Sequence, residues 1–326
     1  MLGINTSSIE YKMVVMTSKA SQFMMENIFP VAFVIGSFWN ILIIIYFVKI
    51  NAMSSYHFLI VNLAIADLMT SGGVALVAYN LNNWRLGKFA CSFLFDMFIK
   101  VCPTVSCFIL VFISYIRYRV IAYPFERRIN KKQCSLVCLA IWIVAILLYI
   151  YLFINRRLVK VGEDLQCVVE NNIINKRFLI NLAIGSLLDS FLPSFSMYRF
   201  YRMISKKLEA DENSNTLQIH EQSRQRNRRA VRTIKALIML YAIAVIPGRI
   251  TDILLTVHLY VVINKFLTAV PLLVSFHHIM YVITSFCIHL NNILNFFIYA
   301  RMIPGFQTFL LRLFTCGSCG SSNSIH

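Results

Sequence analysis

Seven long apolar segments, separated by short polar or basic stretches, occupy most of this 326-residue chain. A helix needs about 20 mostly apolar residues to cross the hydrocarbon core of a bilayer. The hydrophobic content of 58% also exceeds that of an ordinary soluble domain. The sequence therefore predicts an all-α membrane protein with a seven-transmembrane helix bundle. The segments are 28–50, 57–77, 89–123, 136–154, 178–203, 230–257 and 272–300.

The two ends of the chain differ from the bundle in composition. Residues 1–27 lack the long apolar core of a cleavable signal peptide, so we expect an extracellular amino-terminal segment followed by a first helix that anchors itself. Residues 28–303 would form the seven-helix domain. Residues 304–326 begin with an amphipathic stretch, which predicts a short eighth helix on the inner membrane surface and then a cytoplasmic tail.

Basic residues predict the orientation, because lysine and arginine near helix ends are retained in the cytoplasm. With the amino terminus outside, most of the 31 lysines and arginines but a minority of the 14 acidic residues would face the cytoplasm. One inner stretch is the polar insert 205–229, which predicts a loop flanked by helix extensions. The net charge of +17 is thus mainly a cytoplasmic-face feature, and it favours the lipid bilayer over nucleic acid as a partner.

Two short motifs indicate covalent modification. Asn5-Thr6-Ser7 fits the N-glycosylation pattern and would be extracellular, although such a motif also occurs by chance. Cys316 and Cys319 follow the amphipathic stretch, where acylation would add a lipid anchor. An unmodified tail is the alternative.

Motifs follow one another in a fixed order along the segments. They are Gly36 with Asn40, the run 62–68 with Asp67, the run 84–87 followed by Cys91, Arg117-Tyr118 with Pro124, Trp142, Pro193 with Tyr201, Pro247, and Asn295 with Tyr299. In order and spacing the chain resembles the rhodopsin-like (class A) family of G-protein-coupled receptors over about residues 28–314. The resemblance implies a multi-pass plasma-membrane receptor that passes the binding of an extracellular ligand to a heterotrimeric G protein.

The resemblance implies an activation switch at the inner ends of the helices. The residues at the family's coupling positions are Arg117, Tyr118, Tyr201, Tyr299 and Pro247. Arg117 would be held beneath the bundle at rest and released towards the G protein on activation; an arginine that only reaches the headgroup level is the alternative. Ile116 and Asn227 stand where the family commonly has acids. We therefore expect a weakly restrained receptor with appreciable basal activity.

Two further departures concern helix geometry. Phe296 replaces the proline of the family's last motif, which removes one cause of a kink. The stretch from Cys91 to Arg117 is one residue longer than is usual in the family. Pro103 lies within it, so we expect a local bulge there that absorbs the extra residue.

A polar network in the middle of the bundle is implied in the same way. Asp67, Ser106, Asn291 and Asn295 match the family's sodium-site positions, with Asn40 nearby. A carboxylate in the hydrocarbon region is costly and indicates a function. We expect Na⁺ as an allosteric ion, with a hydrogen-bonded water network around Asp67 as the alternative. The sequence indicates no other cofactor.

Two cysteines lie on the oxidising side, Cys91 at the start of the third segment and Cys167 after the fourth. The family resemblance pairs them in a disulfide. Two free thiols are the alternative.

Several ionisable residues in the outer half are not required by the family: Lys100, Asp189, Arg249 and Asp252, with His289 towards the middle of the last helix. Unpaired buried charges are unfavourable, so we expect Arg249 to pair with Asp189 or with Asp252. Such a pair either fixes a contact between helices or belongs to a polar pocket for a charged ligand. The pocket interpretation favours a short peptide.

Other functions remain as alternatives. A receptor for a lipid or another small molecule would have the same fold. A seven-helix transporter or channel would use intramembrane charges to line a path, but the internal repeats and broken helices common in transporters are not evident in the sequence. The sequence contains no recognisable catalytic motif, so we do not expect an enzyme.

Overall fold

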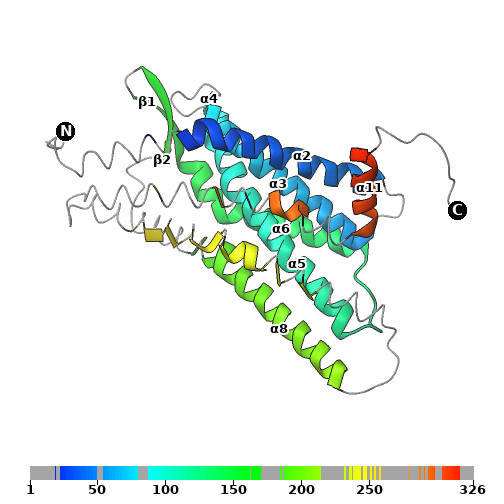
Figure 1. The fold of residues 1–326 in the computed structure, drawn as a ribbon. Coiled ribbons are helices and arrows are strands. Elements are labelled where there is room, and N and C mark those ends of the chain that lie inside the picture. Colours follow the sequence, from blue (N-terminus) through cyan, green and yellow to red (C-terminus); the bar gives the residue numbers. More distant parts are fainter. Residues whose placement is uncertain are drawn as a thin grey trace.

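Long helices packed side by side dominate the computed structural model (Figure 1). The structure describes residues 19, 23–49, 54–79, 87–161, 163–169, 184–185, 187–213, 231–232, 235–236, 238–243, 245–247, 250–251, 253–254, 257, 279, 286–287, 290, 293–297 and 303–315. Its long helices are α2 (Phe29–Lys49), α3 (Ser55–Tyr79), α5 (Cys102–Ala122), α6 (Lys131–Asn155) and α8 (Leu192–Asn213). The shorter helices are α4 (Gly87–Phe89) and α11 (Pro304–Thr315).

Three stretches in the described part of the chain are long and apolar enough to cross a membrane: Glu26–Lys49, Gly87–Ala122 and Lys131–Asn155. They coincide with the first, third and fourth predicted segments. Helices α3 and α8 fall on the second and fifth, and the last two segments are described in short helical pieces. The predicted helical architecture is confirmed for these residues. The part of the insert 205–229 that the structure describes continues α8 to Asn213, as a helix extension.

The start of α6 lies earlier than the apolar pattern predicted. Asn130 accepts a hydrogen bond from the backbone N–H of Gln133, and the side chain of Gln133 accepts one from the backbone N–H of Asn130. This capping box satisfies backbone donors that the first turn of a helix leaves free. Polar residues can therefore form the first turn, and α6 begins at Lys131 rather than 136.

A wide, π-helical turn, Met97–Val101, lies immediately before α5 and ends just short of Pro103. Such a turn inserts an extra residue into a helix without ending it. The local bulge expected near Pro103 is thus present, on the amino-terminal side of the proline. Similar turns are Met24–Ile28, Ala90–Leu94 and Leu187–Phe191.

The core of the bundle lies between α2, α3 and α5. Aliphatic side chains on these helices are fully or almost fully buried, among them Ile43, Leu59, Leu63, Ile109 and Leu110. Many apolar residues on the opposite faces of α2 and α6 are exposed, as expected for helices that face lipid rather than water. The packing of these buried apolar faces sets the positions of the polar side chains that point into the bundle from α2, α3 and α5.

A β-hairpin follows α6 directly and was not predicted. Strands β1 (Arg156–Val161) and β2 (Asp164–Val169) pair antiparallel, with Leu158 opposite Cys167. The pairing of Val161 with Asp164 leaves a two-residue connection, which is among the commonest hairpin lengths. The hairpin adds a small strand element to an otherwise helical chain.

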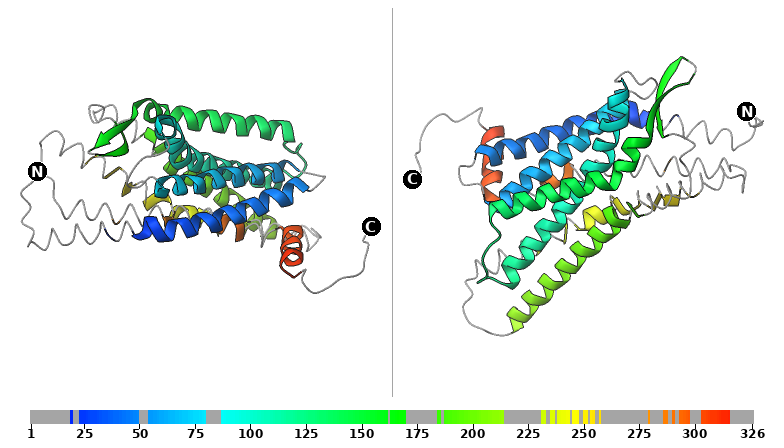
Figure 2. Two further views of the ribbon diagram at one scale, coloured as in Figure 1. Left: turned by 90° about the horizontal axis from the view of Figure 1, so that it is seen from above. Right: turned by 180° about the vertical axis from the view of Figure 1, so that it is seen from behind.

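Helix α11 lies crosswise at the end of α2, and the hairpin lies at the opposite end of the bundle (Figure 2). We call these ends the α11 end and the hairpin end. Phe306 of α11 is fully buried, and its ring lies 4.9 Å from that of Tyr46 on α2. A Cβ at Gly305 would lie 2.5 Å from the hydroxyl oxygen of Tyr46, so any larger residue there would require the Tyr46 side chain to shift.

Candidate functional site

A buried polar cluster lies in the middle of the bundle around Asp67 of α3. The hydroxyl of Ser106 donates to Asp67 Oδ1 at 2.5 Å, and the side-chain amide of Asn295 donates to Asp67 Oδ2 at 2.9 Å. Asp67 is 1% exposed and Asn295 is fully buried. Three of the predicted sodium-site residues therefore meet, although they lie far apart in sequence. Asn291 lies outside the described residues.

Asn40 lies at the same level of the bundle as Asp67. A Cβ on Gly36 would lie 3.1 Å from the hydroxyl oxygen of Ser71, so α2 and α3 approach closely at that point. Asn40 donates to the carbonyl of Gly36, and Ser71 donates to the carbonyl of Asp67. Since the two helices run antiparallel, one turn from the contact brings Asn40 and Asp67 to the same depth.

Two amide oxygens of this cluster, Oδ1 of Asn40 and Oδ1 of Asn295, are buried and have no hydrogen-bond partner among the described residues. A buried acceptor without a partner is unfavourable and calls for an explanation, such as a water or an ion. Carboxylate, hydroxyl and amide oxygens are hard ligands of the kind that hard cations prefer. The donor set therefore fits a small cation.

At the α11 end, the guanidinium of Arg117 lies over the ring of Tyr56, with Cζ 4.0 Å from the ring centroid. Tyr56 is in the first turn of α3, and Arg117 is in the last turns of α5. A cation over an aromatic face contributes about 0.5–1 kcal/mol at an exposed site and about 2 kcal/mol when desolvated. Arg117 was predicted from its motif, whereas nothing in the local sequence marks Tyr56.

Two tyrosines of the predicted switch, Tyr118 on α5 and Tyr201 on α8, pack against one buried apolar pair. The pair consists of Ile121 and Ile204. Helices α5 and α8 therefore lie against each other at this point. Pro247 lies in a helical piece, where its carbonyl accepts a hydrogen bond from Thr251. Tyr299 lies outside the described residues.

The turn after α5 presents an aromatic side chain to solvent. Arg119 forms an ion pair with Glu126, and the backbone N–H of Glu126 donates to the carbonyl of Tyr123 at 3.2 Å. Phe125, which lies between the hydrogen-bonded residues Tyr123 and Glu126, is fully exposed. Exposed aromatic residues are enriched where proteins meet partners. Phe125 was not predicted from the sequence.

Phe296, which stands where the family motif has a proline, packs against other aromatic rings. It is 2% exposed, and its ring stacks on that of Trp39 with the centroids 4.1 Å apart. Its ring also lies nearly perpendicular to that of Phe306 of α11, with the ring centroids 5.6 Å apart. The residue therefore joins its helix to α2 and α11, a contact that the missing proline alone did not predict.

Towards the hairpin end, a buried network connects Asp189 with α5 and α6. Tyr149 of α6 donates a hydrogen bond to the carboxylate of Asp189, which is 2% exposed. Tyr241 donates to the backbone carbonyl of Asp189 at 3.0 Å. The hydroxyl of Thr104 lies 3.4 Å from that of Tyr149 and donates to the carbonyl of Lys100 at 2.8 Å.

Of the predicted pocket residues, this network includes the carboxylate of Asp189 and the backbone carbonyl of Lys100. Their hydrogen-bond partners were not predicted from the sequence. Arg249, Asp252 and His289 lie outside the described residues. The expected pairing of Arg249 with Asp189 or Asp252 therefore stays a prediction.

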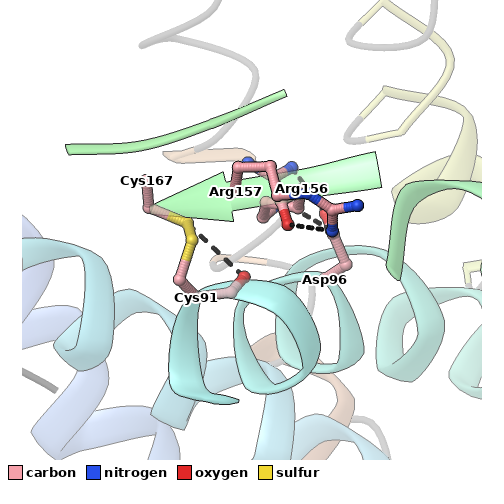
Figure 3. The surroundings of a disulfide bond; sticks show 5 residues. All are labelled: Cys91, Asp96, Arg156, Arg157 and Cys167. Atoms are coloured by element: carbon pink, nitrogen blue, oxygen red, sulfur yellow. Dashed lines mark hydrogen bonds and ion pairs between the residues drawn. A yellow bond between two sulfur atoms is a disulfide. The ribbon is translucent and has the colours of Figure 1, made fainter. Parts of the chain in front are cut away.

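Two links of different chemistry join the hairpin to the helices below it (Figure 3). The predicted disulfide between Cys91 and Cys167 is present and attaches β2. Asp96 and Arg156 form a bidentate ion pair, with Nε to Oδ2 at 2.6 Å and an Nη2 to Oδ1 distance of 2.7 Å. Asp96 is fully buried, and the guanidinium of Arg156 also lies over the Phe95 ring.

The ion pair was not predicted because its partners are 60 residues apart. In the sequence, each partner is simply a charged residue near a predicted helix end. Such charges normally reach water or headgroups. Asn5, Cys316 and Cys319 lie outside the described residues, so the modifications suggested for them stay predictions.

A family model described as 7 transmembrane receptor (rhodopsin family) matches residues 39–299. Proteinase-activated receptor 2 of Bos taurus is 24% identical over 325 residues, which cover 95% of this chain and 76% of the relative. Type-1 angiotensin II receptor of Meleagris gallopavo is 26% identical over 310 residues, or 89% of this chain and 80% of the relative. B1 bradykinin receptor of Canis lupus familiaris is 32% identical over 127 residues, covering 37% of this chain and 35% of the relative.

The family match covers most of the chain and includes the motifs whose side chains build the central cluster and the α11 end. It also accounts for the seven predicted segments. The chain belongs to the rhodopsin family of seven-transmembrane receptors.

Proposed function

We propose that this chain is a plasma-membrane receptor that binds an extracellular peptide and activates a heterotrimeric G protein. The observation that carries the proposal is one continuous helical stretch, Gly87–Ala122. It holds the disulfide to the hairpin near one end and Arg117 near the other. A change imposed at the hairpin end can therefore reach the arginine along a single helix.

The hairpin end is the extracellular one in this proposal, and the amino terminus lies outside. A disulfide at the hairpin end suits an oxidising compartment. The basic residues Arg119, Arg127 and Arg128 lie at the α11 end, in or after the last turn of α5, which suits the cytoplasm. Such a chain acts by binding and conformational change, not by catalysis.

A peptide is the favoured ligand because relatives are named for angiotensin II and bradykinin, which are peptides. Buried polar groups near the hairpin end, including Asp189, are consistent with a charged or polar ligand. A peptide library and a lipid library, applied to cells that express the receptor, test this choice. Agonist activity in the peptide library, lost after protease digestion, supports it. Activity confined to the lipid library contradicts it.

Na⁺ as an allosteric ion is proposed for the central cluster. The carboxylate of Asp67 would hold the ion, with oxygens of Ser106, Asn40 and Asn295 as further ligands. The unpaired amide oxygens of the two asparagines support this assignment. A bound cation would stabilise the arrangement in which these helices meet, and we assign that arrangement to the resting state.

Replacing Asp67 with asparagine is expected to abolish the sensitivity of the receptor to Na⁺, because the neutral amide no longer attracts the ion. In the wild type, the rate of ligand-free nucleotide exchange should be about fivefold or more lower in Na⁺ than in K⁺ at the same ionic strength. Fivefold is the lower end of typical allosteric coupling. The rate of nucleotide exchange on purified G protein, measured in Na⁺ and in K⁺, tests the wild type and the Asp67→Asn variant. Equal rates in Na⁺ and K⁺ for the wild type would show that the ion does not act here.

A further inference from the structure

The first turn of α3, which carries Tyr56, is held in place by hydrogen bonds. The hydroxyl of Ser54 accepts a hydrogen bond from the backbone N–H of His57 at 3.2 Å and so caps the helix. The hydroxyl of Ser55 donates to the carbonyl of Ile129 at 2.9 Å and ties this turn to the segment before α6. Tyr56 lies within this turn, so its backbone is held in place and its ring extends from a fixed point of α3.

Arg117 lies over the face of that ring. Its Cζ lies 4.0 Å from the centroid of the Tyr56 ring, well within the range of a cation–π contact. The residue before it is Ile116, so no carboxylate precedes it in the chain. Glu126 pairs instead with Arg119. Among the described residues no carboxylate pairs with Arg117, and the aromatic ring is the group that holds its guanidinium.

We propose that Tyr56 is a positioning residue that keeps Arg117 in the resting arrangement, in the absence of a neighbouring carboxylate. The inference rests on the proposed G-protein coupling and deepens it. The ring restrains Arg117 through its π face and leaves the guanidinium free of a strong ionic partner. Ligand-free activity is therefore set by the contact between Tyr56 and Arg117.

The test compares two substitutions of Tyr56 in receptors reconstituted in lipid nanodiscs. Tyr56→Leu removes the π face but keeps an apolar side chain, and it is expected to raise ligand-free nucleotide exchange by about three- to tenfold. Tyr56→Phe keeps the ring and is expected to match the wild type. Exchange is measured with purified heterotrimers that represent each class of α subunit, at equal receptor concentration.

A second background separates a direct effect on Arg117 from a change in packing. Ile116→Asp supplies a carboxylate beside Arg117, and it should lower ligand-free exchange. In that background Tyr56→Leu should change exchange by less than twofold, because Arg117 then has another restraint. A structural effect of Tyr56 would be the same in both backgrounds.

Failure of the role assigned to Tyr56 and failure of G-protein coupling give different results. Wild-type exchange in Tyr56→Leu, increased exchange in Tyr56→Phe, or an undiminished effect of Tyr56→Leu beside Ile116→Asp would each overturn the role assigned to Tyr56. In those cases the wild type still drives exchange, and the proposed function stands. If no heterotrimer responds to the wild type or to any variant, the proposed function fails and the role of Tyr56 fails with it.

Discussion

Asp96→Ala is expected to destabilise the receptor by about 3–5 kcal/mol, because it leaves the charge of Arg156 buried without a partner. The Asp96 side chain is fully buried, and that of Arg156 is 10% exposed. Water therefore cannot replace the lost carboxylate without a rearrangement of the hairpin. The expected readout is a lower midpoint temperature for loss of the monodisperse peak in size-exclusion chromatography after heating.

The position of the pair explains why the loss should spread beyond one contact. Arg156 is the first residue of β1, and Asp96 lies in the helical stretch that leads into α5. With the ion pair broken, the hairpin loses one of the two links that join it to this helical stretch, and the Cys91–Cys167 disulfide remains. The start of β1 is then held less firmly against the helices.

Two controls separate the unpaired charge from other effects. Glu163→Ala removes an acid that is exposed on the same hairpin, and it should leave the midpoint temperature unchanged. The double variant Asp96→Leu with Arg156→Met removes both charges and keeps apolar volume, so it should recover most of the loss. A midpoint for Asp96→Ala equal to that of the wild type, or a double variant as unstable as the single one, would contradict the explanation.

Arg117→Ala is expected to lower receptor-catalysed nucleotide exchange by about 10- to 100-fold. This corresponds to the loss of one interaction of a charged donor with the G protein, which contributes about 1.5–3 kcal/mol. The arginine is half-buried, and the ring of Tyr56 is the contact that the substitution removes inside the receptor. Thermal stability should therefore change little.

Exchange on purified heterotrimers, at equal amounts of folded receptor, measures this effect. Arg128→Ala is a matched control, because Arg128 is an exposed arginine in the segment after α5. It should retain most of the activity. An Arg117→Ala receptor that catalyses exchange at the wild-type rate would show that Arg117 does not contribute to coupling.

The fold was predictable where one property is repeated over many residues. Apolar runs of about 20 residues predicted the helices, and the resemblance predicted the disulfide. The start of α6 was not predictable from apolarity, since Asn130 and Gln133 cap a polar turn. The hairpin was missed because its strands are six residues each and follow α6 without an intervening loop.

The candidate site was predictable where a motif marks a residue, as with Asp67, Ser106 and Asn295. The contacts of Arg117 and Asp96 were not, because each depends on two helices or a hairpin meeting at a given level. Tyr56 is 61 residues from Arg117, and no periodicity relates them. The contact of Phe296 was likewise not predictable. The sequence shows only that a proline of the motif is replaced, whereas in the structure the Phe296 ring stacks on Trp39.

We expect this receptor to couple to a heterotrimeric G protein through the α11 end. Complex formation tests it most directly, with the wild-type receptor in nanodiscs mixed with each nucleotide-free heterotrimer and separated by size-exclusion chromatography. The receptor should co-elute with at least one heterotrimer, and GTPγS should dissociate the complex. Failure to co-elute with every heterotrimer, or co-elution that GTPγS does not reverse, would contradict it.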